Sequence, residues 1–124
     1  MLGEARAMGW MLGIVTNGDA AIQARKIAAA GLADLVDAVC ISGAEGVRKP
    51  DPRLFLLAAE MAGAPAGRGW MIGDDPDADV AGGRAAGLRT VWVRRHRIWR
   101  ESGYRPDMQA DTTTEAIGLV LGSP

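Results

Sequence analysis

Short apolar runs alternate along this chain with segments whose apolar residues recur at helical spacing. The apolar runs suit strands that are buried on both faces, and they lie at residues 11–16, 38–42, 70–73 and 90–93. The segments with helical spacing lie at residues 2–8, 20–30, 52–62, 77–86 and 112–121. Strands that alternate with helices predict an α/β fold with a mostly parallel sheet and right-handed crossovers.

Short polar residues mark where the predicted helices begin. Asn17 and Asp19 both suit the N-cap of the second helix, and Asp51 precedes a proline at the start of the third. We expect Asp77 to cap the fourth helix. Residues 43–50 are predicted to form a loop, and the basic, aromatic residues 94–105 have no clear period.

The composition narrows the class of protein. A chain of 124 residues with 48% hydrophobic and 23% charged residues is typical of one soluble globular domain. A net charge of −1 argues against a nucleic-acid-binding protein. No stretch reaches the roughly 20 apolar residues of a membrane span. The single cysteine, Cys40, lies in an apolar run, so we expect a buried thiol and a cytoplasmic protein.

Polar residues that can bind phosphate follow the first predicted strand. The hydroxyl of Thr16 and the backbone N–H groups of Asn17 and Gly18 stand at the start of a helix, where anions are favoured. Lys49, which Pro50 holds in an extended backbone, supplies a positive charge. An ordinary helix cap at Thr16 and a surface lysine at Lys49 are the alternatives.

Four aspartates follow the third predicted strand at Asp74, Asp75, Asp77 and Asp79. Two carboxylates about 4 Å apart repel by roughly 4 kcal/mol at an effective dielectric constant of 20, so such a cluster indicates a compensating cation. All-oxygen ligation by few residues suits Mg²⁺, which keeps several waters and also binds substrate phosphate. We assign this role to Asp74 and Asp79. The one histidine, His96, is expected to be solvated or to lie at an interface.

These segments resemble the haloacid dehalogenase-like hydrolase superfamily, whose members share a Rossmann-like core. The family's second motif, a Thr or Ser at a strand end, is matched by Thr16. Its third, a Lys often followed by Pro, is matched by Lys49. Its fourth, Gly-Asp with a second Asp downstream, is matched by Gly73, Asp74 and Asp79. The resemblance implies a three-layer α/β/α fold.

The resemblance also implies roles for the matched residues. Thr16 would bind the phosphoryl oxygens, and Lys49 would stabilise the charge on the nucleophile and on an aspartyl-phosphate intermediate. Asp74 would bind Mg²⁺, while Asp79 would support the metal or orient Lys49. Within the superfamily the pattern is most similar to phosphatases of small phosphorylated metabolites.

The family's first motif, which supplies the nucleophile, has no counterpart here, because no Asp precedes Asp19. The cap domain is also missing. Residues 1–124 are therefore similar to a partial core domain, truncated at the N-terminus and without the central strand of the sheet. We expect the strands that end at Thr16 and Gly73 to pair directly, or a partner chain or a second copy to supply a strand.

Two functional hypotheses follow. The first is a Mg²⁺-dependent phosphatase core that is impaired alone because it lacks the nucleophile. The second is a non-catalytic interaction or regulatory module that retains a scaffold for phosphate or Mg²⁺. The matched residues favour the first hypothesis for a longer form of the chain, and the missing Asp favours the second for these residues.

Overall fold

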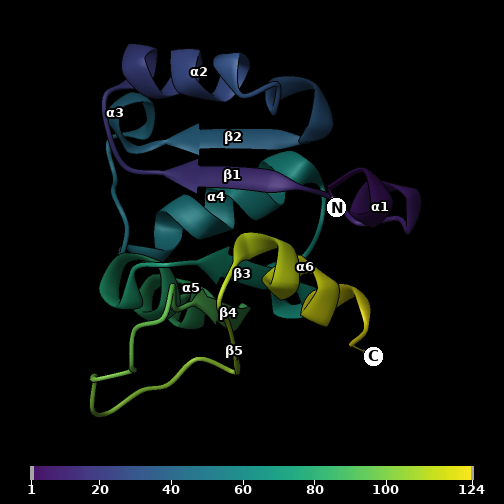
Figure 1. Ribbon diagram of the computed structural model, residues 1–124. Helices are drawn as coiled ribbons and strands as arrows, with labels where there is room; N and C mark the ends of the chain where they lie inside the picture. Colours follow the sequence, from purple (N-terminus) through teal and green to yellow (C-terminus); the bar gives the residue numbers. More distant parts are fainter. Residues whose placement is uncertain (1, 124) are drawn as a thin grey trace.

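The computed structural model describes residues 2–123 and arranges them as helices around parallel strands (Figure 1). The helices are α1 (Leu2–Ala7), α2 (Ala20–Ala29), α3 (Ser42–Glu45), α4 (Pro52–Ala62), α5 (Gly82–Ala85) and α6 (Thr113–Leu121). The strands are β1 (Gly13–Thr16), β2 (Ala38–Ile41), β3 (Trp70–Gly73), β4 (Arg89–Val93) and β5 (Met108–Ala110). Three further turns are η1 (Ala33–Leu35), η2 (Ala66–Arg68) and the π-helical η3 (Pro76–Ala81).

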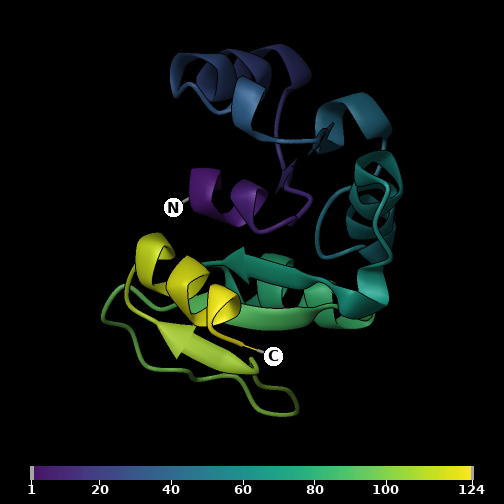
Figure 2. The same ribbon diagram turned by 90° about the vertical axis from the view of Figure 1, so that its right-hand side faces the viewer.

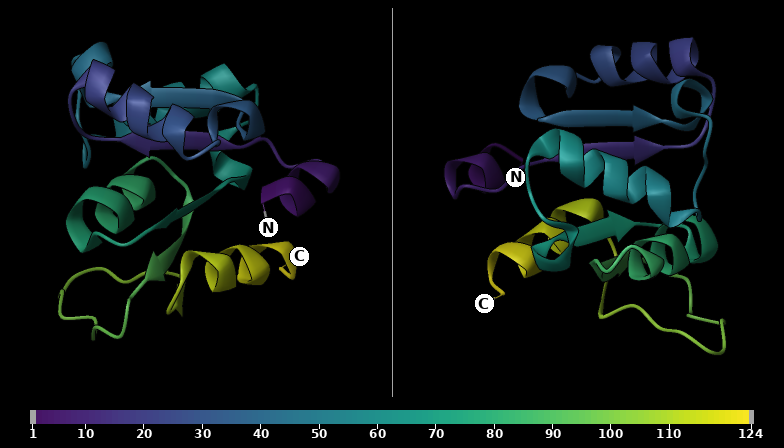
Figure 3. Two further views of the ribbon diagram at one scale, coloured as in Figure 1. Left: turned by 45° about the horizontal axis from the view of Figure 1, so that its top comes forward. Right: turned by 180° about the vertical axis from the view of Figure 1, so that it is seen from behind.

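The strands form two separate parallel sheets. β1 pairs with β2, while β3, β4 and β5 form the other sheet in that order. Helices α4 and α5 lie on one side of the strands and α6 lies on the other (Figure 3). This arrangement is the predicted α/β/α layering, and β1, β2 and β3 all run toward the same end of the molecule (Figure 1).

Helix α4 joins the cores of the two sheets. Leu54 packs with Cys40 of β2, and both side chains are fully buried. One residue further, Phe55 packs in a second cluster with Met71 of β3 and the buried Trp92 of β4. Two apolar residues on one helix therefore hold two sheets together without strand pairing. The predicted burial of Cys40 is confirmed.

Local differences from the predicted elements have identifiable physical causes. The fourth helix begins with a π-helical turn at Pro76, and its cap is Asp75 rather than Asp77, because the Asp75 carboxylate accepts the N–H groups of Asp77 and Ala78 at 2.9 Å. Likewise, Asp19 alone caps α2 by accepting the N–H of Ile22.

Two elements were missed. The predicted loop at residues 43–50 begins with the short helix α3, which ends at Gly46 in the left-handed conformation. The strand β5 follows Asp107, whose carboxylate accepts the N–H of Thr90 at 2.7 Å. That contact joins residues 17 positions apart, so a local pattern does not report it.

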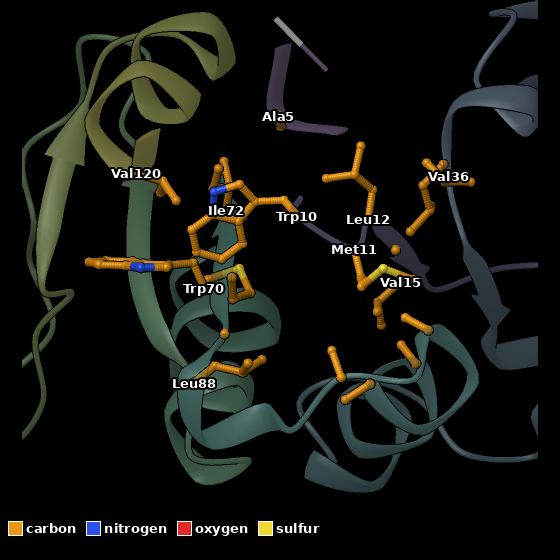
Figure 4. A pocket seen from close by; sticks show the side chains of 18 of the residues that line it. Ala5, Trp10, Met11, Leu12, Val15, Val36, Trp70, Ile72, Leu88 and Val120 are labelled. Carbon is orange, nitrogen blue, oxygen red and sulfur yellow. The ribbon is translucent and has the colours of Figure 1, made fainter. Parts of the chain in front are cut away.

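The expected direct pairing of the flanking strands is wrong: within residues 2–123, β1 and β3 belong to different sheets. An apolar groove of about 550 Å³ lies between them. Trp10 lies across it, between Leu12 and Ile72 (Figure 4). Helix α1 lies at one end of this gap (Figure 2) and contacts both η1 and α6. Bulky side chains thus occupy the space that direct pairing would have to close.

Asp37 anchors the segment before β1, whose residue Leu12 lines the groove. Its carboxylate accepts the N–H of Leu12 at 2.7 Å and the guanidinium of Arg6 at 3.0 Å. Both hydrogen bonds favour the charged form, so they hold the pKa of Asp37 below its usual value.

None of the helices within residues 2–123 has the length and apolar character needed to span a membrane.

A pair of leucines on α4 tests the joining role of this helix. Replacing the fully buried Leu54 with alanine removes contacts with β2 and is expected to lower the free energy of unfolding by about 2–5 kcal/mol. Leu56→Ala is the control, because Leu56 is 44% exposed and should cost well under half as much. Urea denaturation measures both, and equal losses would contradict this account of the core.

Candidate functional site

The predicted site residues lie on loops at the carboxyl ends of β1 and β3. Thr16 is the last residue of β1, and Asp74 directly follows β3. Lys49 precedes α4, and Asp79 lies on the η3 turn. Since β1 and β3 run in the same direction (Figure 1), these loops meet at one edge, which is where parallel α/β sheets bind ligands.

Lys49 and Asp79 form a largely buried ion pair. The Lys49 Nζ lies 2.6 Å from the Asp79 Oδ1, and the side chains are 13% and 10% exposed. The second oxygen of Asp79 accepts the N–H of Asp75 at 3.1 Å. Both carboxylate oxygens of Asp79 are therefore engaged, one by an ammonium group and one by the backbone.

Asn17 fixes the backbone of Lys49. Its side-chain Nδ2 donates to the Lys49 carbonyl at 3.1 Å, and its Oδ1 accepts the Lys49 N–H at 2.8 Å. The sequence suggested that Asn17 caps α2, but its side chain binds the backbone of Lys49 instead. It connects the end of β1 to the lysine loop, 32 residues further along the chain.

Two glycines permit the close approach of these loops. A Cβ on Gly73 would overlap the carboxylate of Asp79. A Cβ on Gly43 would lie 2.6 Å from the carbonyl oxygen of Gly18, whose N–H donates to Ser42 Oγ at 2.9 Å. Contacts this short are essentially never made by real Cβ atoms, so a side chain at either position would force its neighbour to shift.

Asp74 has a different environment from Asp79. Its side chain is 54% exposed, and its Oδ2 lies 3.4 Å from the Nε of Arg95. Its backbone carbonyl accepts hydrogen bonds from Trp92 Nε1 at 2.9 Å and from Arg97 Nη2 at 2.6 Å. The Asp74 backbone is thus held firmly, while its carboxylate faces the surface and has one cationic neighbour.

The arginines beside Asp74 were not predicted as part of the site. Arg95 and His96 both have positive φ, 49° and 64°, which turns the chain back after β4. His96 is solvated as expected, with its side chain 87% exposed. Arg94 pairs with Asp111 and holds the pKa of that carboxyl below its usual value. The one signal in the sequence was a cluster of basic residues directly after a predicted strand.

The structure joins some of the predicted residues and leaves others apart. Lys49, Asp79 and Asn17 form one connected group. The Thr16 hydroxyl donates to the backbone carbonyl of Asn17 at 3.4 Å. Within residues 2–123, no hydrogen bond or ion pair links Thr16 or Asp74 to Lys49 or Asp79. In the same residues, no cluster of three His, Cys, Asp or Glu side chains could hold a metal ion. Of the two residues predicted to bind the metal, Asp74 has an exposed carboxylate that suits a cation with its own water ligands, whereas both oxygens of Asp79 are engaged.

Comparison with known proteins identifies the family. A model of the haloacid dehalogenase-like hydrolase family matches residues 1–87. The chain belongs to this family. It is 41% identical to a phosphoserine phosphatase of Thermus thermophilus over 116 residues, which are 94% of the chain and 47% of that protein. It is 40% identical to the pyrimidine 5'-nucleotidase YjjG of Escherichia coli, covering 88% of the chain and 49% of that protein.

Solved structures agree with the sequence comparison. A HAD phosphatase from Thermococcus onnurineus matches 98% of the chain with a TM-score of 0.85 and 31% identity, over 55% of its own length. The HAD hydrolase YfnB of Bacillus subtilis, solved with bound magnesium, matches 96% of the chain with a TM-score of 0.84 and 25% identity, over 53% of its own length. The Rossmann-like fold of the family is therefore confirmed. The chain spans about half the length of the curated relatives it matches.

Gly73 provides a test of the packing at this site. Gly73→Ala places a methyl group against the Asp79 carboxylate, and we expect it to lower the free energy of unfolding by about 1–3 kcal/mol. Gly67→Ala is the matched control, because a Cβ there meets nothing within 4 Å. Thermal denaturation of both variants measures the difference. A Gly73→Ala protein as stable as the control would show that the two loops do not pack as described.

Proposed function

We propose that this chain carries the phosphate- and magnesium-binding part of a phosphatase that acts on a small phosphorylated metabolite. The proposal rests on family membership and on the phosphatases among its relatives. The observation that carries it is the buried Lys49–Asp79 pair, which Asn17 connects to the end of β1. A cation held this firmly at the ligand-binding edge suits recognition of a phosphoryl group.

We assign contact with the phosphoryl oxygens to Lys49 and to the hydroxyl of Thr16. Lys49 Nζ has three N–H donors, and one of them already donates to Asp79. The backbone N–H of Gly18, which the sequence also suggested, donates to Ser42 Oγ. The side chain of Asn17 binds the backbone of Lys49, so only the backbone N–H of Asn17 stays a candidate for the phosphoryl oxygens. The Asn17 side chain positions the lysine loop, and Gly18, which is held to α3, is not assigned to the substrate.

We assign the metal to Asp74. Its exposed carboxylate suits a hydrated Mg²⁺ that takes its remaining ligands from water and from substrate phosphate. When bound, the ion would neutralise charge on the transferring phosphoryl group. Arg95 forms an ion pair with the same carboxylate and would have to move away when the metal binds. Asp79, whose two oxygens are engaged, is assigned to holding Lys49.

The attacking carboxylate is placed outside these residues. The family forms an aspartyl-phosphate from an Asp in its first motif, and residues 1–124 contain no Asp before Asp19. We therefore infer that the chain binds phosphate and metal but needs a nucleophile from elsewhere to turn over. The alternative is a non-catalytic module that retains a scaffold for phosphate or Mg²⁺. The ion pair between Arg95 and Asp74 favours phosphate as the ligand of such a module, because that pair neutralises the carboxylate assigned to the metal.

Magnesium binding tests the assignment of Asp74. Isothermal titration calorimetry with MgCl₂ is expected to show one site on the unmodified chain. Asp74→Asn removes the ligand charge and should weaken binding by roughly tenfold or more. The control is Asp77→Asn, an exposed neighbour that should leave the affinity within about twofold. Equal effects of the two substitutions would show that the ion does not bind through Asp74.

Turnover distinguishes a complete enzyme from a partial site. With p-nitrophenyl phosphate and Mg²⁺, the purified chain should hydrolyse no faster than Lys49→Ala, because Lys49 has no nucleophile to assist. Lys26→Ala, at an exposed lysine on α2, is the matched control. If the unmodified chain and Lys26→Ala both showed magnesium-dependent hydrolysis and Lys49→Ala did not, the inference that the nucleophile lies outside these residues would be refuted.

A further inference from the structure

A second pocket lies between the turn that follows β3 and the loop that follows β4. Its volume is about 360 Å³, which is within the range of sites for small organic ligands. The apolar residues that line it are Pro76, Trp92 and Ile98. The charged and titratable residues that line it are His96, Arg97, Arg100 and Glu101.

Aromatic packing holds the walls of this pocket in place. Trp99 packs edge-on against Trp92, with ring centroids 5.0 Å apart, and against Tyr104 at 5.4 Å. The Trp99 Nε1 donates to the Tyr104 carbonyl at 3.1 Å, and the Tyr104 hydroxyl donates to the Pro76 carbonyl at 3.2 Å. These contacts fix the loop between β4 and β5, which projects from the strands in Figure 1, to the turn η3. Because the walls are already ordered, a ligand binds with a smaller loss of conformational entropy.

Arg97 has hydrogen-bond donors to spare in a fixed position. Its guanidinium carbon lies 5.1 Å from the centre of the Trp92 ring. Its Nε donates to the Arg94 carbonyl at 2.8 Å, and its Nη2 donates to the carbonyls of Asp74 at 2.6 Å and Val93 at 3.1 Å. A guanidinium group has five N–H donors, and within residues 2–123 the two on Nη1 make no hydrogen bond. The cation is therefore held firmly while part of it stays available to a ligand.

The charge of the lining favours an anion. None of the ion pairs within residues 2–123 includes Arg97 or Arg100. Among the described residues that line the pocket, Glu101 is the one acidic residue. Two guanidinium groups therefore outweigh one carboxylate, and the lining is positive even with His96 neutral. The whole chain, by contrast, carries a net charge of −1.

We propose that this pocket binds a carboxylate or phosphate group of a small organic anion. Arg97 and Arg100 supply the charge, because the planar guanidinium group matches the oxygens of either anion and pairs with two of them at once. Pro76 and Ile98 contact the carbon skeleton of the ligand. The site uses neither the missing nucleophile nor the metal, so it goes beyond the proposed function.

The pocket borders the candidate site through Asp74. Two of its lining residues, Trp92 and Arg97, donate to the Asp74 carbonyl. The anion therefore has two possible sources. One is a second anionic group of the substrate, a source that rests on the proposed function, and the other is a separate small anion. Both make the same contacts with the arginines, and they differ in whether Lys49 affects binding in the pocket.

The first experiment tests whether the pocket binds a carboxylate. Sodium D-glycerate is added to the ¹⁵N-labelled full chain, and nuclear magnetic resonance follows the backbone amide signals. Ionic strength is kept constant, because salt screens exposed charges. We expect saturable shifts at residues 96–101. Glycerol, which has a CH₂OH group in place of the carboxylate, is the neutral control and should leave these signals unchanged.

Three variants locate the binding. Arg100→Gln removes a guanidinium group from the lining and should weaken glycerate binding about tenfold. Arg105→Gln is the matched control, because Arg105 is an exposed arginine of the same loop that does not line the pocket. Glu101→Gln removes a repelling charge and should strengthen binding by about twofold or more. All three residues are exposed, so we expect the variants to fold, and thermal denaturation checks this.

A second experiment distinguishes the two sources with 3-phosphoglycerate, which carries both a phosphate and a carboxylate group. If one ligand reaches both places, residues 16–18 and 96–101 shift together, and Lys49→Ala weakens binding in the pocket. If the pocket takes a separate anion, residues 96–101 shift equally in Lys49→Ala and in the unmodified chain. Either result supports the pocket.

Three results would overturn the proposal. One is the absence of shifts at residues 96–101 with both glycerate and 3-phosphoglycerate. Another is an equal response to glycerol, and the third is equal glycerate binding by Arg100→Gln and Arg105→Gln. Failure of the pocket and failure of the proposed function are distinguishable. Shifts at residues 16–18 alone overturn the pocket and support phosphate binding near Lys49, whereas shifts at residues 96–101 alone support the pocket and contradict that phosphate site.

Discussion

The ion pair between Lys49 and Asp79 is the constraint on which the candidate site depends. Lys49 belongs to the loop that Asn17 connects to β1, and Asp79 belongs to the turn that follows β3. A largely buried pair offsets its desolvation only with good geometry and further hydrogen bonds. Both are present here: the contact is short, and the second carboxylate oxygen accepts a backbone N–H. The Asp79 carboxylate lies so close to Gly73 that a Cβ at this position would overlap it, which explains why a glycine is found there.

Within residues 2–123, the two sheets are joined by contacts other than the pairing of strands. Phe55 carries apolar packing from α4 to β3, the Lys49–Asp79 pair joins the loops, and Trp10 lies across the groove. These contacts leave a continuous core on the α4 side and the open apolar groove between β1 and β3. Asp79 of the candidate site also lines this groove, so whatever occupies the groove borders the candidate site.

Much of the fold could be predicted because its signals are local. Buried strands appear as apolar runs, and glycines stop the helices, so the strands at 38–41 and 70–73 and the helix at 52–62 were found within a residue. Elements that depend on distant partners were missed or misassigned. β5 depends on pairing with β4, and the cap of η3 depends on which of several neighbouring aspartates turns toward the backbone.

By itself, the sequence determined the family, the α/β class and the identity of the residues at the strand ends, because order and spacing along the chain suffice for each. The tertiary structure alone decided what those residues do to one another. It directed Asn17 to the backbone of Lys49, paired Asp79 with that lysine and left Asp74 at the surface beside Arg95. It also separated β1 from β3. Contacts between residues about 30 positions apart depend on how loops and side chains pack, which no local pattern records.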